Sequence, residues 1–161
     1  MNTTLIDNPP SSAADLTASA AGLVAGASLE MSAAAIDDVR GIATLLPVGT
    51  KVYVNHSPRH VLADSLPTLV ALRESGLEPV PHMAARLIVS RVEARSFLDR
   101  ATGEAGVAKV LLVGGDDPQV RGPYDSGAAL LRDGVLAQCG VREVGMPGYP
   151  EGHQRIANTV L

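Results

Sequence analysis

The sequence predicts an α/β fold, because short strand-like segments alternate with longer helix-like segments along most of the chain. Five apolar segments are separated by stretches in which apolar residues recur every three or four positions. Strands that alternate with helices in this way form parallel βαβ units with right-handed crossovers. The length of 161 residues and the 46% content of hydrophobic residues suit one domain with a sizeable core.

The chain opens with residues 1–22, which we expect to be a flexible leader that ends in a short helix. Residues 8–11 read Asn-Pro-Pro-Ser and are typical of a loop. Ser11 or Ser12 can cap a helix that runs to Gly22. The remaining residues, 23–161, form the predicted barrel domain.

The first half of that domain carries two strands and two helices. Leu23–Met31 is a short apolar run, which predicts a strand, and Ser32–Leu46 has apolar residues at helical spacing behind a capping serine. Lys51–Asn55 is rich in β-branched residues and predicts the second strand. His60–Ser75 contains a leucine stripe, and its regular helix should begin near Pro67 because proline suits the first helical turn.

The second half continues the alternation. Glu78–Met83 is extended because its two prolines forbid a helix, and Ser90–Thr102 is an amphipathic helix. Lys109–Val113 is a buried strand that runs into a glycine pair. Asp125–Cys139 has one apolar stripe, Glu143–Tyr149 predicts the last strand, and a further helix is expected after it.

Polar residues follow every predicted strand, which favours part of a (β/α)₈ barrel of about five units over an open parallel sheet. In a barrel this edge is functional at every strand, whereas an open sheet gathers ligand groups at one switch point. A complete barrel takes roughly 200 residues or more. We therefore expect either a longer parent chain or a half-barrel whose open edges are covered by a partner. The polar residues are Glu30, Asn55, His56, His82, Asp116 and Tyr149 to His153.

Composition excludes several classes of function. The net charge of −4 and the pI near 5.5 argue against nucleic acid or an anionic membrane as partner. Asp7 and Asp15 precede the first apolar stretch, where a secretory signal needs positive charge. Cys139 is the single cysteine, and His56 and His60 flank a proline that breaks a zinc-binding helix. We expect a cytoplasmic protein with no metal site.

Each polar residue has a functional and a structural interpretation. Glu30 is either a buried catalytic acid or an exposed residue at a helix start. Asp116 follows Gly114-Gly115 and either points into a pocket or caps a turn, the role that we favour for Asp117. His82 is either a ligand-contacting donor or a hydrogen-bonded core histidine.

Four short motifs, taken in order, resemble the methylenetetrahydrofolate reductase family. Tyr149–His153 is similar to that family's Tyr-Pro-Glu-x-His segment. Pro81–Met83 resembles its Pro-His-Leu strand end, and Leu112–Pro118 resembles its Leu-Arg-Gly-Asp-x-Pro strand end. Ser28–Glu30 resembles its Ser-Phe-Glu. The likeness touches four of the five predicted strand ends.

The resemblance implies a flavin enzyme that reduces 5,10-methylenetetrahydrofolate to 5-methyltetrahydrofolate, with FAD as cofactor and NAD(P)H as electron donor. Glu30 would be the acid that protonates N10 of the folate, and Asp116 would stabilise the cation that accepts hydride. Glu30, Asn55 and Asp116 would bind the folate. The residues that would line FAD are His82, Gly114, Gly115, Asp116, Ser126, Gly127, Tyr149 and His153.

Three departures from the family pattern keep an alternative open. Gly114 stands where the family has arginine, so a cation and its donors are lost from the cofactor side. Asn55–Pro58 replaces Thr-Tyr-Gly-Ala, and Met31–Ala34 replaces Phe-Phe-Pro-Pro. We therefore expect FAD to be held weakly, in a homo-oligomer or with a complementing chain. The alternative is a non-catalytic folate-binding or scaffold half-barrel that acts with a partner.

Overall fold

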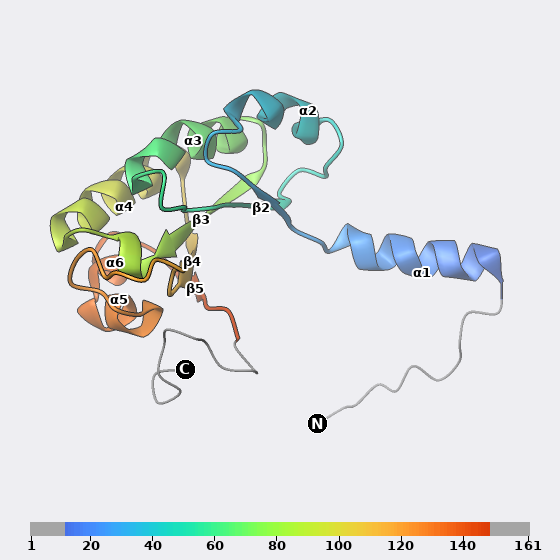
Figure 1. Ribbon diagram of the computed structural model, residues 1–161. Coiled ribbons are helices and arrows are strands. Elements are labelled where there is room, and N and C mark those ends of the chain that lie inside the picture. Colours follow the sequence, from blue (N-terminus) through green and yellow to red (C-terminus); the bar gives the residue numbers. More distant parts are fainter. Residues whose placement is uncertain (1–11, 149–161) are drawn as a thin grey trace.

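Five parallel strands form one sheet in the computed structural model, which describes residues 12–148 (Figure 1). The strands pair in sequence order, β1-β2-β3-β4-β5, and every pair is parallel. This arrangement confirms the predicted α/β class and its five parallel units. The strands are β1 Leu29–Met31, β2 Lys51–Val54, β3 Glu78–Ala84, β4 Lys109–Val113 and β5 Glu143–Gly145.

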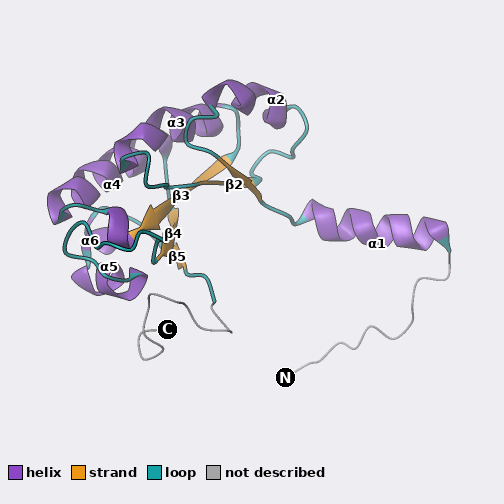
Figure 2. Ribbon diagram, viewed as in Figure 1, coloured by secondary structure: helices purple, strands orange, loops and turns teal. Residues whose placement is uncertain are grey.

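The helices that connect the strands lie on one face of this sheet and form an arc around it (Figure 2). Sequential order with right-handed crossovers requires this one-sided arrangement. It is the arrangement of five consecutive barrel units, and equally that of a singly wound open sheet. These helices are α2 Val39–Ala43, α3 Leu66–Glu74, α4 Arg91–Ala105, α5 Gly127–Asp133 and α6 Val135–Gln138. The first helix, α1 Ala13–Ala25, precedes β1 and projects away from the sheet (Figure 1). Short 3₁₀ turns precede α2 and α3 and follow β3, at Ile36–Asp38, Leu62–Ser65 and Ala85–Leu87.

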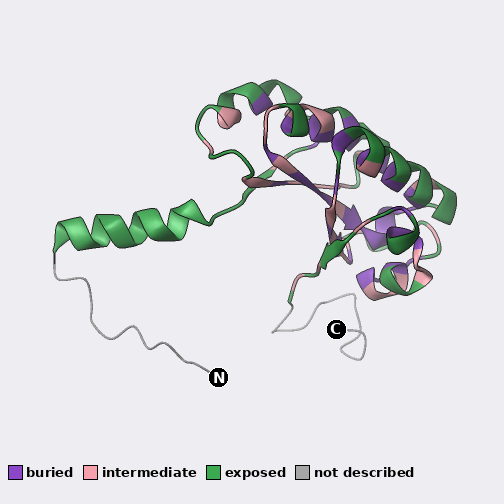
Figure 3. Cartoon of the chain, turned by 180° about the vertical axis from the view of Figure 1, so that it is seen from behind, coloured by how far each residue is buried: buried purple, intermediate pink, exposed green. Residues whose placement is uncertain are grey.

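The hydrophobic core lies between the sheet and the helix arc (Figure 3). Alternate residues of β2 and β4 face it, so Val52 and Val54 are buried while Lys51 and Tyr53 are partly exposed. The helices contribute a larger set of fully buried side chains, among them Leu69, Leu72, Leu98 and Leu130.

The opposite face of the sheet carries charged residues near the amino ends of the strands. Lys51 lies directly opposite Glu78, and Lys109 lies opposite Glu143, with 3.6 Å between the Lys109 and Glu143 charged groups. Cross-strand pairs of opposite charge contribute roughly 0.2–1 kcal/mol each. These charged pairs mark the amino-terminal end of that face, whereas Val80 and Leu111 lie further along it.

Two predicted boundaries in the first third of the chain were wrong. The first helix continues through Gly22 to Ala25, so Leu23–Met31 supplies only the three residues of β1. A single glycine in an alanine-rich stretch costs about 1 kcal/mol and does not end a helix by itself. Ser12 is the N-cap, and its Oγ accepts the Asp15 amide at 3.1 Å. In Ser32–Leu46 only α2 and the 3₁₀ turn are helical.

Two further segments are shorter than predicted. The helix expected over Asp125–Cys139 is split into α5 and α6 at Gly134, whose φ of +80° is left-handed. The strand expected over Glu143–Tyr149 ends at Gly145, and Tyr149 lies outside the described residues. Other predictions were confirmed, since α3 starts with Pro67 in its first turn and β4 spans the predicted residues.

Candidate functional site

A pocket of about 440 Å³ opens where the carboxyl ends of the strands meet. Parallel α/β proteins bind their ligands beyond this edge of the sheet. Residues at or just after the ends of β2, β3, β4 and β5 contribute to the wall, so segments far apart in sequence meet here. The lining residues are His56, Ser57, Pro58, His82, Ala84, Leu87, Val113, Gly115, Asp116 and Pro147.

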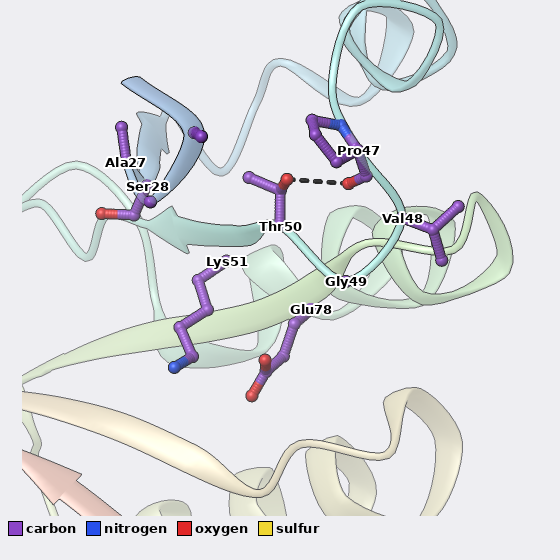
Figure 4. Close-up of a pocket in the computed structure, with 10 residues that line it drawn as sticks. Ala27, Ser28, Pro47, Val48, Gly49, Thr50, Lys51 and Glu78 are labelled. Atoms are coloured by element: carbon purple, nitrogen blue, oxygen red, sulfur yellow. Dashed lines mark hydrogen bonds between the residues drawn. The ribbon is translucent and has the colours of Figure 1, made fainter. Parts of the chain in front are cut away.

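A second pocket, of about 300 Å³, lies at the opposite edge, near the junction of α1 and β1 (Figure 4). Lys51 and Glu78, the first residues of β2 and β3, line this pocket. The Thr50 hydroxyl donates to the Pro47 carbonyl at 2.7 Å and holds the turn before β2. In barrels the amino-terminal edge serves stability rather than chemistry. The pocket at the carboxyl edge is therefore the candidate functional site.

His56 follows β2 and presents a neutral imidazole to this pocket. Its Nδ1 accepts the backbone N–H of Ala84 at 3.2 Å, which ties the loop after β2 to the end of β3. Because Nδ1 accepts, the ring proton resides on Nε2. Burial lowers the pKa of His56 to about 4. The imidazole is uncharged at neutral pH.

His82, in the middle of β3, faces the pocket with an unsatisfied ring nitrogen. Its Nε2 is buried and has no hydrogen-bond partner among the described residues. The Tyr53 ring packs against it edge-to-face, with ring centroids 5.8 Å apart. Burial lowers the pKa of His82, and the nearby negative charge of Glu30 opposes that shift. The half-buried ring therefore does not match the interpretation as a hydrogen-bonded core histidine.

Asp116 reaches the pocket from the loop between β4 and α5. Gly115, just before it, has a φ of +88°, and a Cβ there would lie 3.3 Å from the Cβ of Ala84. Both the backbone conformation and the close approach to β3 require glycine at this position. Gly114 is buried beside it. The glycine pair thus brings the loop close to β3, and Asp116 lines the pocket as an exposed residue.

Asp117 has the structural role that the sequence favoured. Its Oδ1 accepts the Gln119 amide at 2.9 Å, which closes an Asx-type turn. Its Oδ2 accepts from the Arg121 guanidinium at 2.7 Å. The same guanidinium approaches the Pro58 carbonyl at 3.4 Å and so links the loop after β4 with the loop after β2.

Arg86, just after β3, is the main support of the loop that carries Asp116. It is buried, and its guanidinium donates to the Asp117 and Pro118 carbonyls at 2.9 and 3.0 Å. A longer contact of 3.5 Å reaches the Asp125 carbonyl. The Arg86 backbone also donates to Gly114, at 3.1 Å. Arg86 thereby holds the loop after β4 at its start, through its backbone and its side chain, and reaches Asp125 near the end of the loop.

Glu30 and Asn55 lie near the pocket but do not line it. Glu30 sits on β1 opposite Tyr53, on the same sheet face as His82, and it is exposed. Asn55 follows β2, is partly buried, and its backbone N–H donates to the Met31 carbonyl at 3.0 Å. A general acid that holds its proton near neutral pH must be shielded from water. No residue within 12–148 shields Glu30 in this way.

Ser126 and Gly127 form the start of α5 and also lie outside the pocket lining. The Ser126 hydroxyl caps the helix by accepting the Ala129 amide at 3.2 Å, and it donates to Asp125 Oδ1 at 2.9 Å. A Cβ at Gly127 would lie 3.3 Å from the Leu112 Cβ. Within the described residues, Ser126 and Gly127 therefore cap α5 and let its first turn pack closely on β4.

Of the predicted site residues, the structure brings His82, Gly115 and Asp116 together in one pocket. Tyr149 and His153 lie outside the described residues. Sequence reasoning missed Arg86 and gave His56 no site role. Arg86 bonds to backbone carbonyls more than thirty residues away, a partnership that leaves no pattern in the sequence.

No protein-family model matches the chain. Across residues 12–148, no three His, Cys, Asp or Glu side chains are grouped as metal ligands would be. In the same part of the chain, every helix is too short or too polar to traverse a bilayer.

Proposed function

We propose that the chain is part of a flavin oxidoreductase of the methylenetetrahydrofolate reductase type. It would reduce 5,10-methylenetetrahydrofolate to 5-methyltetrahydrofolate, with FAD as cofactor and NAD(P)H as donor. The observation that carries the proposal is one pocket at the carboxyl edge in which His82 and Asp116 meet. These residues belong to two of the four motifs on which the family resemblance rests.

The pocket fits the ring of a flavin or a pterin in two respects. The buried Nε2 of His82 needs a partner that residues 12–148 do not supply, and leaving such an atom unpaired costs about 1–3 kcal/mol. A flat heterocycle edge offers that partner. Gly115 allows the backbone to approach closely, and Ala84, Leu87 and Val113 supply apolar walls.

FAD, when bound, would accept hydride from the nicotinamide and pass it to the folate. The chain's own residues would prepare that transfer. His82 and His56, both neutral, would orient the rings through hydrogen bonds without adding positive charge. Asp116 would stabilise the cationic iminium form of the folate by its negative charge. Glu30 would donate the proton that N10 takes up when the methylene bridge opens.

The proposal includes a second copy of the chain or a complementing chain. Glu30 is exposed on β1, an edge strand of the described sheet, and β5 is the other edge. Edge strands with unpaired backbone groups invite pairing. A segment laid beside β1 would cover Glu30 and exclude water from it. Because the reaction draws on the reduced nicotinamide and folate of one-carbon metabolism, we place it in the cytoplasm.

A scaffold that binds folate without catalysis is the second candidate. The exposure of Glu30 favours it, as does Gly114 at the position where the family has arginine. Such a protein would use the same pocket for the pterin ring and would leave the redox step to another protein.

A visible absorption spectrum of the purified full chain, with and without added FAD, separates the two candidates. The enzyme should show flavin bands that NADH or NADPH bleaches and methylenetetrahydrofolate restores. A sample that binds folate but never retains flavin would contradict the reductase and support the scaffold.

The role of Glu30 is tested by Glu30→Gln, with Glu143→Gln on the same sheet face as the matched control. Glu30→Gln should lower folate reduction at least about 100-fold, the lower range for loss of a general acid, and leave the flavin spectrum intact. Glu143→Gln should keep normal turnover. Full activity in Glu30→Gln would remove Glu30 from the mechanism.

A further inference from the structure

A glutamate, a tyrosine and a histidine form a row across the face of the sheet opposite the helix arc (Figure 2). Glu30 on β1 is the register partner of Tyr53 on β2. Tyr53 in turn is the partner of Val80 on β3, and His82 is the next residue of β3 that points to the same face. Because β2 lies between β1 and β3, Tyr53 stands between the carboxylate and the imidazole.

The Tyr53 ring is in direct contact with the His82 ring. The two rings meet edge-to-face, with centroids 5.8 Å apart and an angle of 63° between their planes, which is a preferred geometry for aromatic pairs. On the other side, Leu111 of β4 is the register partner of His82. The imidazole thus lies between an aromatic ring and a leucine, and its buried Nε2 has no hydrogen-bond partner among the described residues.

Glu30 acts on His82 through its charge and is not bonded to the His82 Nε2. Burial lowers the pKa of His82, and the negative charge of Glu30 opposes that shift. Neighbouring strands are spaced by about 4.8 Å, so β1 and β3 lie about 10 Å apart. Glutamate and histidine side chains together are long enough to span this separation when the space between them is empty.

We infer that Tyr53 is a positioning residue, whose ring keeps the Glu30 carboxyl group from pairing with the His82 imidazole and leaves the His82 Nε2 open to the pocket. This inference rests on the proposed function, which needs Glu30 as a proton donor and His82 as a neutral hydrogen-bonding group. If the two side chains paired, the acid proton of Glu30 would move to His82. A carboxylate and an imidazolium would result, and both roles would be lost.

The other titratable side chains near His82 do not stand behind the Tyr53 ring. His56 follows β2 and Asp116 follows β4, and both line the pocket together with His82. The charge that opposes the shift of the His82 pKa is that of Glu30. Removing the Tyr53 ring should therefore bring His82 under the influence of Glu30 in particular.

The test is a set of NMR titrations that follow the His82 ring nitrogens in the ligand-free full chain. Tyr53→Ala admits both water and the Glu30 side chain to His82, and adding Glu30→Gln removes only the second effect. In the unmodified chain, Glu30→Gln should lower the His82 pKa by a few tenths of a pH unit. In the Tyr53→Ala background it should lower that pKa by about one pH unit or more, as for a close opposite charge.

Two controls separate the ring from general loosening of the sheet. Tyr53→Phe keeps the ring and should reproduce the unmodified chain. Leu111→Ala removes the neighbour of His82 on the side away from Glu30, so the effect of Glu30→Gln should stay small there. Tyr53→Val, a strand-favouring residue that is too short to separate the two groups, is the second test variant. Circular dichroism confirms that each variant is folded.

The size of the Glu30→Gln effect with and without the ring decides the matter. A small effect in the unmodified chain and a large one in Tyr53→Ala or Tyr53→Val supports the inference. Equal effects, whether small or large, would overturn it, because the ring would then separate nothing. The reductase proposal would survive that result. Conversely, a full chain that never reduces methylenetetrahydrofolate would contradict the reductase and leave the measured role of Tyr53 in place.

Discussion

Two arginines, Arg86 and Arg121, hold the loop that brings Asp116 to the pocket. Arg86 is buried, and the partners of its guanidinium within residues 12–148 are carbonyls, whereas Arg121 is partly exposed and pairs with Asp117. A buried cation that is hydrogen-bonded to backbone carbonyls is costly to remove, and an exposed ion pair contributes about 0–1 kcal/mol. Arg86 should therefore matter far more to stability than Arg121.

Replacing Arg86 by methionine should lower the free energy of unfolding by about 2–4 kcal/mol, because it leaves carbonyls of the loop without donors. Arg100→Met is the matched control, since Arg100 is an exposed partner of Glu104 on α4. It should cost clearly less than Arg86→Met, because an ion pair that is fully exposed to solvent contributes little to stability. Urea titrations give both values, and equal costs would show that Arg86 does not support the loop.

His56 makes stability depend on pH in a defined direction. In the unfolded chain its pKa is near 6.5, and in the folded chain it is about 4, so the unfolded state binds more protons between these values. The folded state therefore has its full stability with respect to His56 above pH 6.5. It loses up to about 3 kcal/mol of its free energy of unfolding as the pH falls toward 4. His82 adds to the loss in the same direction.

Thermal unfolding of His56→Asn from pH 7 to pH 4 checks this, because an amide oxygen can still accept the Ala84 N–H but does not titrate there. The variant should lose less stability than the unmodified chain over that window. If stability falls with pH as steeply in His56→Asn as in the unmodified chain, His56 is not the cause of the pH dependence.

The elements differ widely in how far they are packed. α4 contributes five buried residues to the core, whereas none of the residues of α1 is buried and the helix projects away from the sheet. An isolated helix of this length is marginal in water. The stability of the sheet layer should therefore be independent of α1.

This independence is tested by one substitution in each helix. Leu98→Ala in α4 should lower the free energy of unfolding by about 2–5 kcal/mol, since Leu98 is fully buried. Leu23→Ala in α1, where 81% of the leucine is exposed, should change it by less than about 0.5 kcal/mol. A cost above 1 kcal/mol for Leu23→Ala would show that something covers α1 in solution.

Element types were predictable where one signal dominated. The prolines of β3 and the β-branched run of β2 left no alternative to extended chain, and Pro67 marked the start of α3. Boundaries failed where glycine was ambiguous. Gly22 was expected to end a helix and did not, while Gly134 interrupts one through its left-handed φ. Gly134 follows Asp133, and Asp-Gly is a turn signal, whereas Gly22 lies in an alanine-rich stretch that favours a helix.

At the scale of the whole molecule, sequential strand order explains why one pocket can gather the motif residues. Because all strands run in the same direction, His82 at β3 and Asp116 after β4 must meet at one edge. That meeting was predictable from the order of motifs. The supporting contacts of Arg86 and the neutral His56 beside Ala84 were not, since both depend on backbone atoms brought together only by folding.

The most direct test of the central claim is NMR of the histidine ring nitrogens during titration with riboflavin or 6-methylpterin. The account predicts that the His56 and His82 ring signals shift on binding, with His82 Nε2 changing most, while the signals of His60, which does not line the pocket, stay in place. Ligand binding that leaves the His82 ring unchanged would contradict the account.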